Sequence, residues 1–304
     1  MPPQKFIKWQ ISRGEPMQLN IYKDVKQFYK DTYNILMGHE VENLIPLGNL
    51  IIGNEGKDKT GWRDPANWLM ATVTEAREIK LTAIMTPPFG ITLYETDNVH
   101  NPAALECLVK GLLDTKISVP RVMTNKSLAE NFTKLYTKAT GQNHEIYMRQ
   151  RVFKLSKVNP QISTHGTMRL VRPSDMTFFP YWVEHAMNIF TGRDIVIPDT
   201  TTDYDYRIDK KLYYILEDDG VPVTMACITR EMQNIAGVGM VYTPPYFRSK
   251  GYASSCVAQL SQLILDRGFK YCVLYTDLTN PTSNSIYQKI GYEAVCDFLE
   301  IKFM

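Results

Sequence analysis

Residues 238–254 read VGMVYTPPYFRSKGYAS, and this stretch decides which fold the chain of 304 residues is expected to adopt. The apolar run ends at Tyr242, and the two prolines that follow cannot donate to a neighbouring strand, so the pattern predicts a strand that stops there. A basic turn containing Gly251 then leads into an amphipathic stretch, which predicts a helix over residues 252–266. Gly251 accepts a positive φ, and the amides around it lie at the positive end of that helix. This combination suits a pyrophosphate group.

The predicted anion site consists of one basic residue and the positions that follow it. These are Arg248, Ser249, Lys250, Gly251, Tyr252, Ala253 and Ser254. A second polar stretch comes after the next predicted strand, residues 271–276, and reads TDLTNPTSNSIYQKIGYE from Thr276 to Glu293. It predicts a loop and then a short helix that ends near a glycine.

At these residues the chain resembles the GNAT superfamily of N-acetyltransferases. The acetyl-CoA signature of that family is Arg or Gln, two residues, Gly, one residue, and Gly or Ala, and it stands here as Arg248-x-x-Gly251-x-Ala253. Taken alone, this hexapeptide also fits an ordinary helix N-terminus. The family's second cofactor motif is matched in the same order at Asn280, Asn284, Tyr287, Gly291 and Tyr292. Two separately placed motifs in the right order favour the resemblance over chance.

The resemblance implies acetyl-CoA as co-substrate and gives roles to residues of the second motif. Asn280 and Asn284 would bind the cofactor, with Asn284 hydrogen-bonded to the pantetheine or pyrophosphate arm, and Tyr287 would lie near the sulfur. A phenol with a pKa of about 10 stays protonated at neutral pH and can donate a proton to a leaving thiolate. The alternative for Tyr287 is a half-buried helix aromatic that packs with Ile286 and Ile290.

The resemblance also implies two parallel strands that splay apart, with the pantetheine arm filling the gap like an added strand. The acyl carbonyl would then meet a main-chain N–H at the splay, which stabilises the negative charge that develops when an amine attacks. The expected donors are the amides of Val241, Tyr242 or Thr243.

The predicted elements of residues 167–304 follow the order strand, helix, hairpin, central strand, helix, strand, helix and final strand. A turn at Asp219-Gly220 joins the two strands of the hairpin. This order predicts an α/β fold with a mixed sheet and helices on both faces. The resemblance to the GNAT superfamily implies, in addition, that the central sheet is mostly antiparallel and contains a splayed parallel pair. Residues 156–167 form a polar linker in this interpretation, so the predicted domains are residues 1–160 and 161–304.

The N-terminal half repeats parts of the C-terminal half. Residues 83–89, AIMTPPF, echo residues 240–246, MVYTPPY. Further echoes of later elements follow in the same order, at residues 117–123, 135–138 and 145–155. We therefore predict two tandem GNAT-like mixed α/β domains that arose by duplication. No Arg-x-x-Gly-x-Ala follows Phe89, so the first copy is expected to be degenerate, to lack a pyrophosphate site and to form a wall over the acceptor cleft. The alternative is that the Thr-Pro-Pro triplet recurs by chance.

The acceptor side of the predicted site is less clearly marked in the sequence. Attack on a thioester requires a neutral amine and hence a base, and Glu231 is the candidate because it closely precedes the central strand in the chain. The alternative for Glu231 is a solvated turn charge beside Arg230. Aromatic and acidic residues in the loop over residues 191–209 suit a cationic amine, and the expected pocket lining is Tyr204, Asp205 and Tyr206. The alternative is a mobile surface loop, which would have a similar composition.

Composition argues against several classes of protein. A net charge of only +2, with 44% hydrophobic and 22% charged residues, gives no indication of nucleic acid or an anionic membrane as a partner. Five cysteines without paired spacing predict a reducing, cytoplasmic location, and five singly scattered histidines predict no metal site. No apolar stretch approaches the length of a membrane span. A homodimer stays open as an assembly.

Two functions from different classes follow from these observations. The first is an enzyme that transfers an acetyl group from acetyl-CoA to the primary amine of a small molecule or peptide, by direct attack in a ternary complex. The second is a non-catalytic acyl-CoA-binding or regulatory interaction protein, which keeps the cofactor site and lacks the acceptor chemistry. Tyr287 favours the enzyme, because binding alone needs no proton donor near the sulfur.

Overall fold

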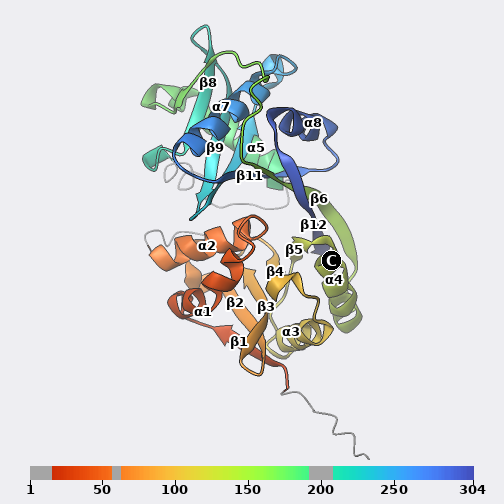
Figure 1. Ribbon diagram of the computed structural model, residues 1–304. Coiled ribbons are helices and arrows are strands. Elements are labelled where there is room, and N and C mark those ends of the chain that lie inside the picture. The colour runs from red at the N-terminus through yellow and green to blue at the C-terminus, as the bar shows by residue number, and fades with distance from the viewer. Residues whose placement is uncertain (1–15, 57–62, 192–207) are drawn as a thin grey trace, which may run out of the picture.

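The computed structural model describes residues 16–56, 63–191 and 208–304 (Figure 1). One 12-stranded sheet runs through the molecule, with its strands in the order β1-β2-β3-β4-β5-β12-β6-β11-β10-β9-β8-β7. The strands are β1 (Gln18–Tyr22), β2 (Leu69–Glu75), β3 (Glu78–Met85), β4 (Ile91–Glu95), β5 (Arg121–Asn125), β6 (His144–Leu155), β7 (Thr167–Leu170), β8 (Tyr213–Asp218), β9 (Val221–Glu231), β10 (Ile235–Tyr242), β11 (Tyr271–Asp277) and β12 (Glu293–Phe303). The α-helices are α1 (Val25–Met37), α2 (Leu44–Glu55), α3 (Pro102–Asp114), α4 (Lys126–Thr140), α5 (Phe179–Thr191), α7 (Tyr252–Asp266) and α8 (Pro281–Ile290).

Each half of the chain has the same order of elements. The first half runs from β1 to β6 and the second from β7 to β12, and in each a strand is followed by a helical segment, three strands, a helix, a strand, a helix and a final strand. β4 and β5 are parallel, as are β10 and β11, and all the other neighbouring strands are antiparallel. The predicted fold class, a mixed and mostly antiparallel sheet in two tandem GNAT-like units, is therefore confirmed.

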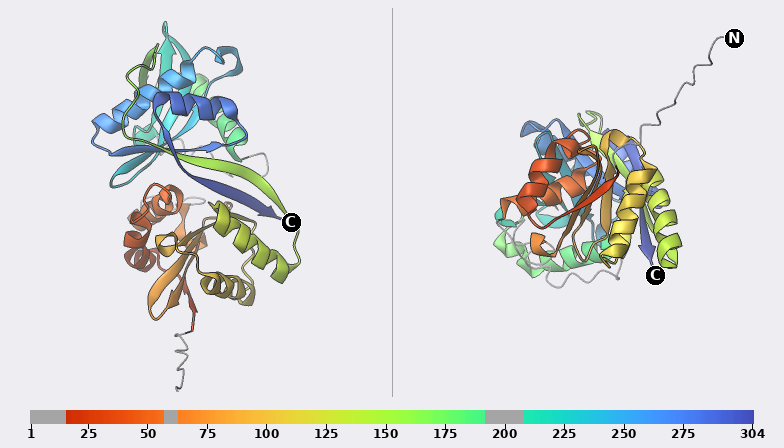
Figure 2. Two further views of the ribbon diagram at one scale, coloured as in Figure 1. Left: turned by 45° about the vertical axis from the view of Figure 1, so that its right-hand side comes forward. Right: turned by 90° about the horizontal axis from the view of Figure 1, so that it is seen from below.

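The two halves share their last strands. β12 ends the second half but lies between β5 and β6 of the first, and β6 ends the first half but pairs with β11 of the second. Figure 2 shows β6 and β12 side by side, running between the two halves of the molecule. The division at residue 160 stays a prediction of the sequence, whereas in space each half is completed by a strand of the other.

The echo between residues 83–89 and 240–246 does not mark equivalent positions, so this part of the repeat prediction was wrong. Met85 ends β3, which is antiparallel to both of its neighbours, whereas Tyr242 ends β10, which is parallel to β11. The counterpart of β10 is β4, because β4 pairs in parallel with β5. A strand that ends in Thr-Pro-Pro is a local stop signal and carries no information about which strand it ends.

Alternation along the strands divides the core between the two faces of the sheet. In the first half, Ala71 and Val73 pack with α3 and α4, whereas Met70 packs with α1 and α2. In the second half, Ala226 packs with α7 and Cys227 packs with α5. The face that carries α1, α2 and α5 is opposite to the face that carries α3, α4, α7 and α8. No helix in the part of the chain that the structure describes is long and apolar enough to cross a bilayer.

One hydrophobic cluster joins the two halves. Leu44 and Leu47 of α2 are buried in the same cluster as Ile235 of β10 and Val273 of β11. Full burial of each such side chain stabilises the fold by about 1.5–3 kcal/mol, as an upper estimate. The helix α2 therefore packs firmly against the parallel pair of the second half.

The predicted linker, residues 156–167, lies along α7. The ring Nε2 of His165 donates to the carbonyl of Lys250 at 2.9 Å, and the main-chain amide of His165 donates to the Ser255 hydroxyl at 3.2 Å. The side-chain amide of Gln259 donates to the carbonyl of Gly166 at 3.2 Å. These bonds fix the entry of the chain into β7 beside the start of α7.

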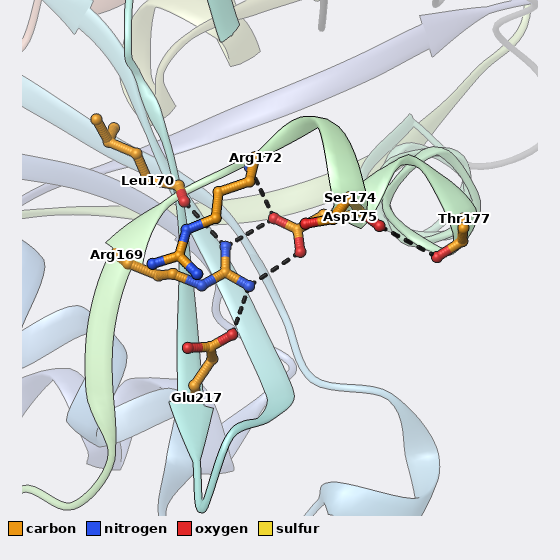
Figure 3. Close-up of polar contacts among 7 residues, drawn as sticks. All are labelled: Arg169, Leu170, Arg172, Ser174, Asp175, Thr177 and Glu217. Carbon is orange, nitrogen blue, oxygen red and sulfur yellow. Dashed lines mark hydrogen bonds and ion pairs between the residues drawn. The ribbon is translucent and has the colours of Figure 1, made fainter.

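A network centred on Arg169 positions the start of α5 (Figure 3). Its guanidinium donates to both carboxylate oxygens of Asp175, at 2.7 and 2.9 Å, and to Glu217 of β8 at 2.5 Å. Burial alone would raise the pKa of Asp175, but the hydrogen bonds from Arg169 and from the Arg172 amide hold it below its ordinary value. The hydrogen bond from Arg169 likewise lowers the pKa of Glu217. The network ties β7, β8 and the turn before α5 together.

Candidate active site

The parallel strands β10 and β11 pair only where they begin. The paired residues are Ile235 with Tyr271, Ala236 with Cys272 and Gly237 with Val273. Beyond them β10 continues to Tyr242 and β11 to Asp277 without a hydrogen bond between the two strands. The predicted splay is therefore present, and it leaves main-chain groups of both strands facing a gap.

A β-bulge in β10 turns its main chain towards this gap. Gly239 pairs with Cys227 and Tyr242 pairs with Met225, so β10 uses one residue more than β9 over the same stretch. Met240 lies inside the bulge with a φ of 51°, a left-handed conformation that is uncommon for a side chain of this kind. A bulge bends the strand and turns its amides away from the ladder. The amides of residues 241–243 follow the bulge directly, where the acyl carbonyl was expected.

The end of β10 is held by side-chain hydrogen bonds. The Thr224 hydroxyl donates to the carbonyl of Tyr242 at 2.8 Å and is hydrogen-bonded to the Thr243 hydroxyl, also at 2.8 Å. The Nε of Arg248 donates to the carbonyl of Thr243 at 3.0 Å. Val241 packs towards α7 and Tyr242 packs towards α5, so their side chains lie on opposite faces of the sheet. The backbone between them is thus fixed at the rim of the gap.

The turn before α7 presents main-chain donors. Ser249 and Gly251 both adopt the left-handed conformation, with φ values of 61° and 81°, and Gly251 is the N-cap of α7 without a side-chain capping bond. Within the described ranges, the amides of residues 249–254 donate to no protein acceptor. A Cβ at Gly251 would lie 3.0 Å from the His165 ring. Free amides, a helix N-terminus and the nearby Lys250 fit a pyrophosphate group.

The second motif supplies one free acceptor. Asn280 caps α8 by accepting from the Ser283 amide at 3.1 Å, so its side chain is engaged in the protein. The side-chain amide of Asn284 donates to the carbonyls of Asp277 and Asn280, at 3.0 and 2.8 Å. Its Oδ1 is buried and has no hydrogen-bond partner among the described residues. An unsatisfied buried acceptor at the end of β11 suits an amide N–H, such as those of the pantetheine arm.

Tyr287 lies on α8 with its ring half-buried between aromatic neighbours. The ring centroids of Phe153 and Tyr292 are 6.4 and 5.9 Å away. Burial raises the pKa of Tyr287 to about 12, so the hydroxyl keeps its proton at neutral pH. In the described part of the chain this hydroxyl has no hydrogen-bond partner. The ring therefore packs as the alternative interpretation expects, and the hydroxyl is available as the acid interpretation requires.

Comparison with known proteins agrees with this geometry. The family described as FR47-like protein matches residues 221–299. A GCN5-related N-acetyltransferase from Sphaerobacter thermophilus has a similar structure, with a TM-score of 0.63, 12% identity and coverage of 94% of this chain and 95% of the other. A GNAT-family acetyltransferase from Colwellia psychrerythraea has a TM-score of 0.56 at 12% identity, over 94% and 98% of the two chains. The chain has the GNAT fold. No curated protein matches its sequence.

A third similar structure, from Drosophila, shows that the likeness extends over both halves of the GNAT fold. Its TM-score is 0.64 at 13% identity, over 94% of this chain and 98% of the other. The family match at residues 221–299 runs from β9 into β12 and so contains the splay, the turn before α7 and α8. The resemblance inferred from the two motifs is therefore confirmed for the fold.

The GNAT fold does not bring Glu231 to the gap. Glu231 ends β9 and faces Ala236 at the start of β10, and it forms an ion pair with Arg267 at 2.6 Å. The bulge lies at the other end of β10, about 16 Å away at roughly 3.3 Å per residue. Glu231 is close to β10 in the chain, but it lies beside the first residues of that strand, whereas the bulge lies near its last residues. Tyr204, Asp205 and Tyr206, the expected acceptor pocket, lie outside the described residues.

Two residues on the face of the sheet that carries α1, α2 and α5 make contacts that the sequence does not indicate. Nδ1 of His185, on α5, is hydrogen-bonded to the Tyr242 hydroxyl at 2.7 Å. Tyr275 of β11 donates to the carbonyl of Glu42 at 2.8 Å and packs on the face of α1 and α2. Both contacts join segments far apart in the chain, so no spacing in the sequence indicates them.

The first half of the GNAT fold has an equivalent gap, and it is closed. β4 and β5 pair at Ile91 with Val122 and at Thr92 with Met123. Immediately beyond, the Thr124 hydroxyl donates to the carbonyl of Leu93 at 2.6 Å, which bridges the two strands. The remaining cavity has a volume of about 10 Å³, about enough for one water molecule.

The start of α3 is also occupied from within the first half. Glu95, which is 5% exposed, accepts from the Asn101 amide and from the ring N–H of His100, both at 2.9 Å. An acidic side chain thus lies where the second half offers free amides. This geometry agrees with the expectation that the first copy is degenerate.

Proposed function

We propose that this protein is an acetyl-CoA-dependent N-acetyltransferase that moves an acetyl group to the primary amine of a small molecule or peptide. The observation that carries the proposal is the alignment of free donors with the gap. The unpaired amides of residues 249–254 follow β10 in the chain, and Tyr287 lies on α8, which follows β11, so both are candidates to meet a cofactor held in the gap. The similar protein from Sphaerobacter thermophilus is described as an N-acetyltransferase and the one from Colwellia psychrerythraea as an acetyltransferase, which supports the same reaction class.

In this proposal each group of residues has its own role in binding or reaction. The amides before and at the start of α7 would hold the pyrophosphate, and Oδ1 of Asn284 would accept from an amide of the pantetheine arm. Acetyl-CoA, when bound, supplies the activated thioester. Main-chain amides among Val241, Tyr242 and Thr243 would stabilise the negative charge that develops on the carbonyl oxygen.

Tyr287 would protonate the leaving sulfur. A group with a pKa of about 12 is fully protonated at neutral pH, and a thiolate is a sufficient acceptor when it is held against the hydroxyl. The amine would attack directly in a ternary complex, so no covalent intermediate on the protein is needed.

We propose a cytoplasmic location with neither nucleic acid nor a membrane as partner, which the modest net charge and the five free cysteines support.

A non-catalytic acyl-CoA-binding protein is the second candidate, because the first half of the chain shows how such a site loses function. Release of CoA thiol in the presence of polyamines, amino acids, aminoglycosides and peptides separates the two functions. Calorimetry with acetyl-CoA is the parallel measurement. The enzyme proposal would be contradicted if the protein binds acetyl-CoA tightly but no amine raises thiol release above the rate of hydrolysis.

A further inference from the structure

The gap between β10 and β11 has different chemistry on its two faces. Tyr287 packs with Phe153 and Tyr292 on the face of α7 and α8. Tyr242 packs on the opposite face, with Trp182 of α5 at a ring distance of 6.1 Å. A thioester held in the gap would therefore have its sulfur beside Tyr287 and its carbonyl carbon open to the face of α5.

Glu231 lies opposite the start of β10 and is paired with Arg267, so it does not serve as the base for an acceptor at the bulge. An amine that attacks from the face of α5 must pass a proton to a group on that face. His185 is placed there by α5, and histidine is the side chain whose charge changes near neutral pH. Its contact with the Tyr242 hydroxyl connects it to the strand end that carries the expected oxyanion donors.

The pair is built so that a proton can move along it. Tyr242 is 6% exposed, and its carbonyl is fixed by the Thr224 hydroxyl, so the phenol has little freedom to turn away. His185 lies on the exposed side of α5, and its Nε2 has no hydrogen-bond partner in the described part of the chain. Tyr242 therefore belongs to the strand that borders the gap, and the exposed ring of His185 can exchange protons with water.

We propose that His185, acting through the Tyr242 hydroxyl, accepts the proton that the acceptor amine loses as it attacks; this inference rests on the proposed acetyltransferase function. The amine nitrogen forms the C–N bond, its N–H proton passes to the Tyr242 oxygen, and the proton of that hydroxyl passes to Nδ1 of His185. The C–S bond breaks, the thiolate takes the proton of Tyr287, and the two residues return to their starting forms by exchange with water. His185 is thus a positioning and relay residue, because it acts through Tyr242.

Neighbouring charges do not replace His185 in this role. Burial raises the pKa of Tyr242 and the charge of Arg248 lowers it, with a net increase, so the phenol relays a proton without ionising at neutral pH. Among the described residues, the other charged or titratable groups on α5 and the segments around it include Tyr181 and Glu184 on α5 itself, Arg172 and Asp175 before it, Tyr213 and Glu217 on β8, and Cys227 on β9. Asp209, Lys210 and Lys211 follow Ile208, which packs in the same cluster, and Glu217 is bound by Arg169. Asp175 is committed to Arg169, and Tyr213 and Cys227 are buried.

The test compares pH profiles of kcat/KM for wild type, His185→Gln and Tyr242→Phe, with the amine that gives the fastest CoA release. We expect His185→Gln to lower kcat/KM about 100-fold at neutral pH and to remove the acid limb between about pH 5 and 8. Acetyl-CoA affinity by calorimetry should stay within about 3-fold, because neither side chain lines the turn before α7. His144→Gln, on the exposed start of β6, is the matched control and should keep the wild-type profile.

Rescue separates proton relay from a merely structural contact. His185→Ala should regain activity when imidazole is added, since His185 is exposed and imidazole can reach the Tyr242 hydroxyl. An unchanged acid limb in His185→Gln, or no rescue in His185→Ala while both variants bind acetyl-CoA normally, would overturn the relay alone. A wild-type protein that releases no CoA with any amine would overturn the relay together with the proposed function.

Discussion

The carboxylate of Glu95 accepts a hydrogen bond from the main-chain amide of Asn101, 2.9 Å away, directly before α3. In the second half, the equivalent helix α7 follows its N-cap Gly251, and the amides of residues 251–254 donate to no acceptor in the described ranges. A carboxylate built into the chain thus satisfies the helix N-terminus at which the second half would hold a phosphate. Closure of the neighbouring gap by Thr124 completes the difference between the halves.

This difference predicts that one molecule of acetyl-CoA binds per chain. Isothermal titration calorimetry should give a stoichiometry of one for the wild type. Glu95→Gln should also give one, because the Thr124 bridge still closes the gap, although its unfolding free energy should fall by about 1 kcal/mol. Two sites per chain in either protein would contradict the degenerate first half.

Substitution of Gly251 tests the anion site directly. Gly251→Val should weaken acetyl-CoA binding by about 100-fold, because a β-branched residue resists the φ of 81° and its Cβ meets the His165 ring at 3.0 Å. Gly268→Val is the matched control, since Gly268 has a φ of 94° with nothing near its Cβ and lies after the far end of α7. It should bear a similar backbone strain and bind acetyl-CoA normally. Equal acetyl-CoA affinities in Gly251→Val and Gly268→Val would contradict the assignment of the turn before α7 as the pyrophosphate site.

The local features of the second half could be predicted because each is encoded in adjacent residues. A strand stopped by prolines, a glycine that opens a helix and a short helix that ends at a glycine all appear in the structure at the expected positions. Apolar runs likewise predicted the strands of the second half, because each run lies within a single strand.

The relations between halves could not be predicted in the same way. β6 and β12 are both long antiparallel strands, and nothing within either one specifies that it completes the other half. His185 meets Tyr242 only through the packing of α5 on β10, and Glu231 is close in the chain to β10 but opposite its far end. Pairing across the sheet decides these contacts, and local sequence does not describe it.

Removal of the Tyr287 hydroxyl tests its role as acid. Tyr287→Phe should bind acetyl-CoA like the wild type and turn over about 100-fold more slowly, because the sulfur leaves without a proton donor. With the pKa of Tyr287 at about 12, the hydroxyl loses its proton only far above neutral pH, so it should cause no alkaline fall in wild-type activity up to about pH 10. Stopped-flow measurement of thiol release over pH 6–10 checks both statements.

The first half offers a matched control for Tyr287. Tyr136 on α4 occupies the equivalent helix, and its hydroxyl accepts from the Val119 amide at 3.0 Å in the core. Tyr136→Phe should lower the unfolding free energy by about 1–3 kcal/mol, since it leaves a buried amide without an acceptor, and should leave turnover unchanged. Equal losses of turnover in the two variants would assign both effects to stability and none to proton transfer.

The Arg169 network predicts a stability difference that depends on pH. Arg169→Met should destabilise the fold by about 3 kcal/mol at pH 6, because it leaves Asp175 buried without its cation. The pKa values of Asp175 and Glu217 are lowered in the fold, so their contribution is complete above the unfolded values of about 4 and is lost as the pH falls through the folded values. The difference in unfolding free energy between wild type and Arg169→Met should therefore shrink in urea titrations carried out at pH 3.

Arg151→Met is the control, because Arg151 and Asp297 form a more exposed pair that should contribute less than about 1 kcal/mol. A difference of the same size at both pH values would show that Arg169 acts through packing and not through its two carboxylates.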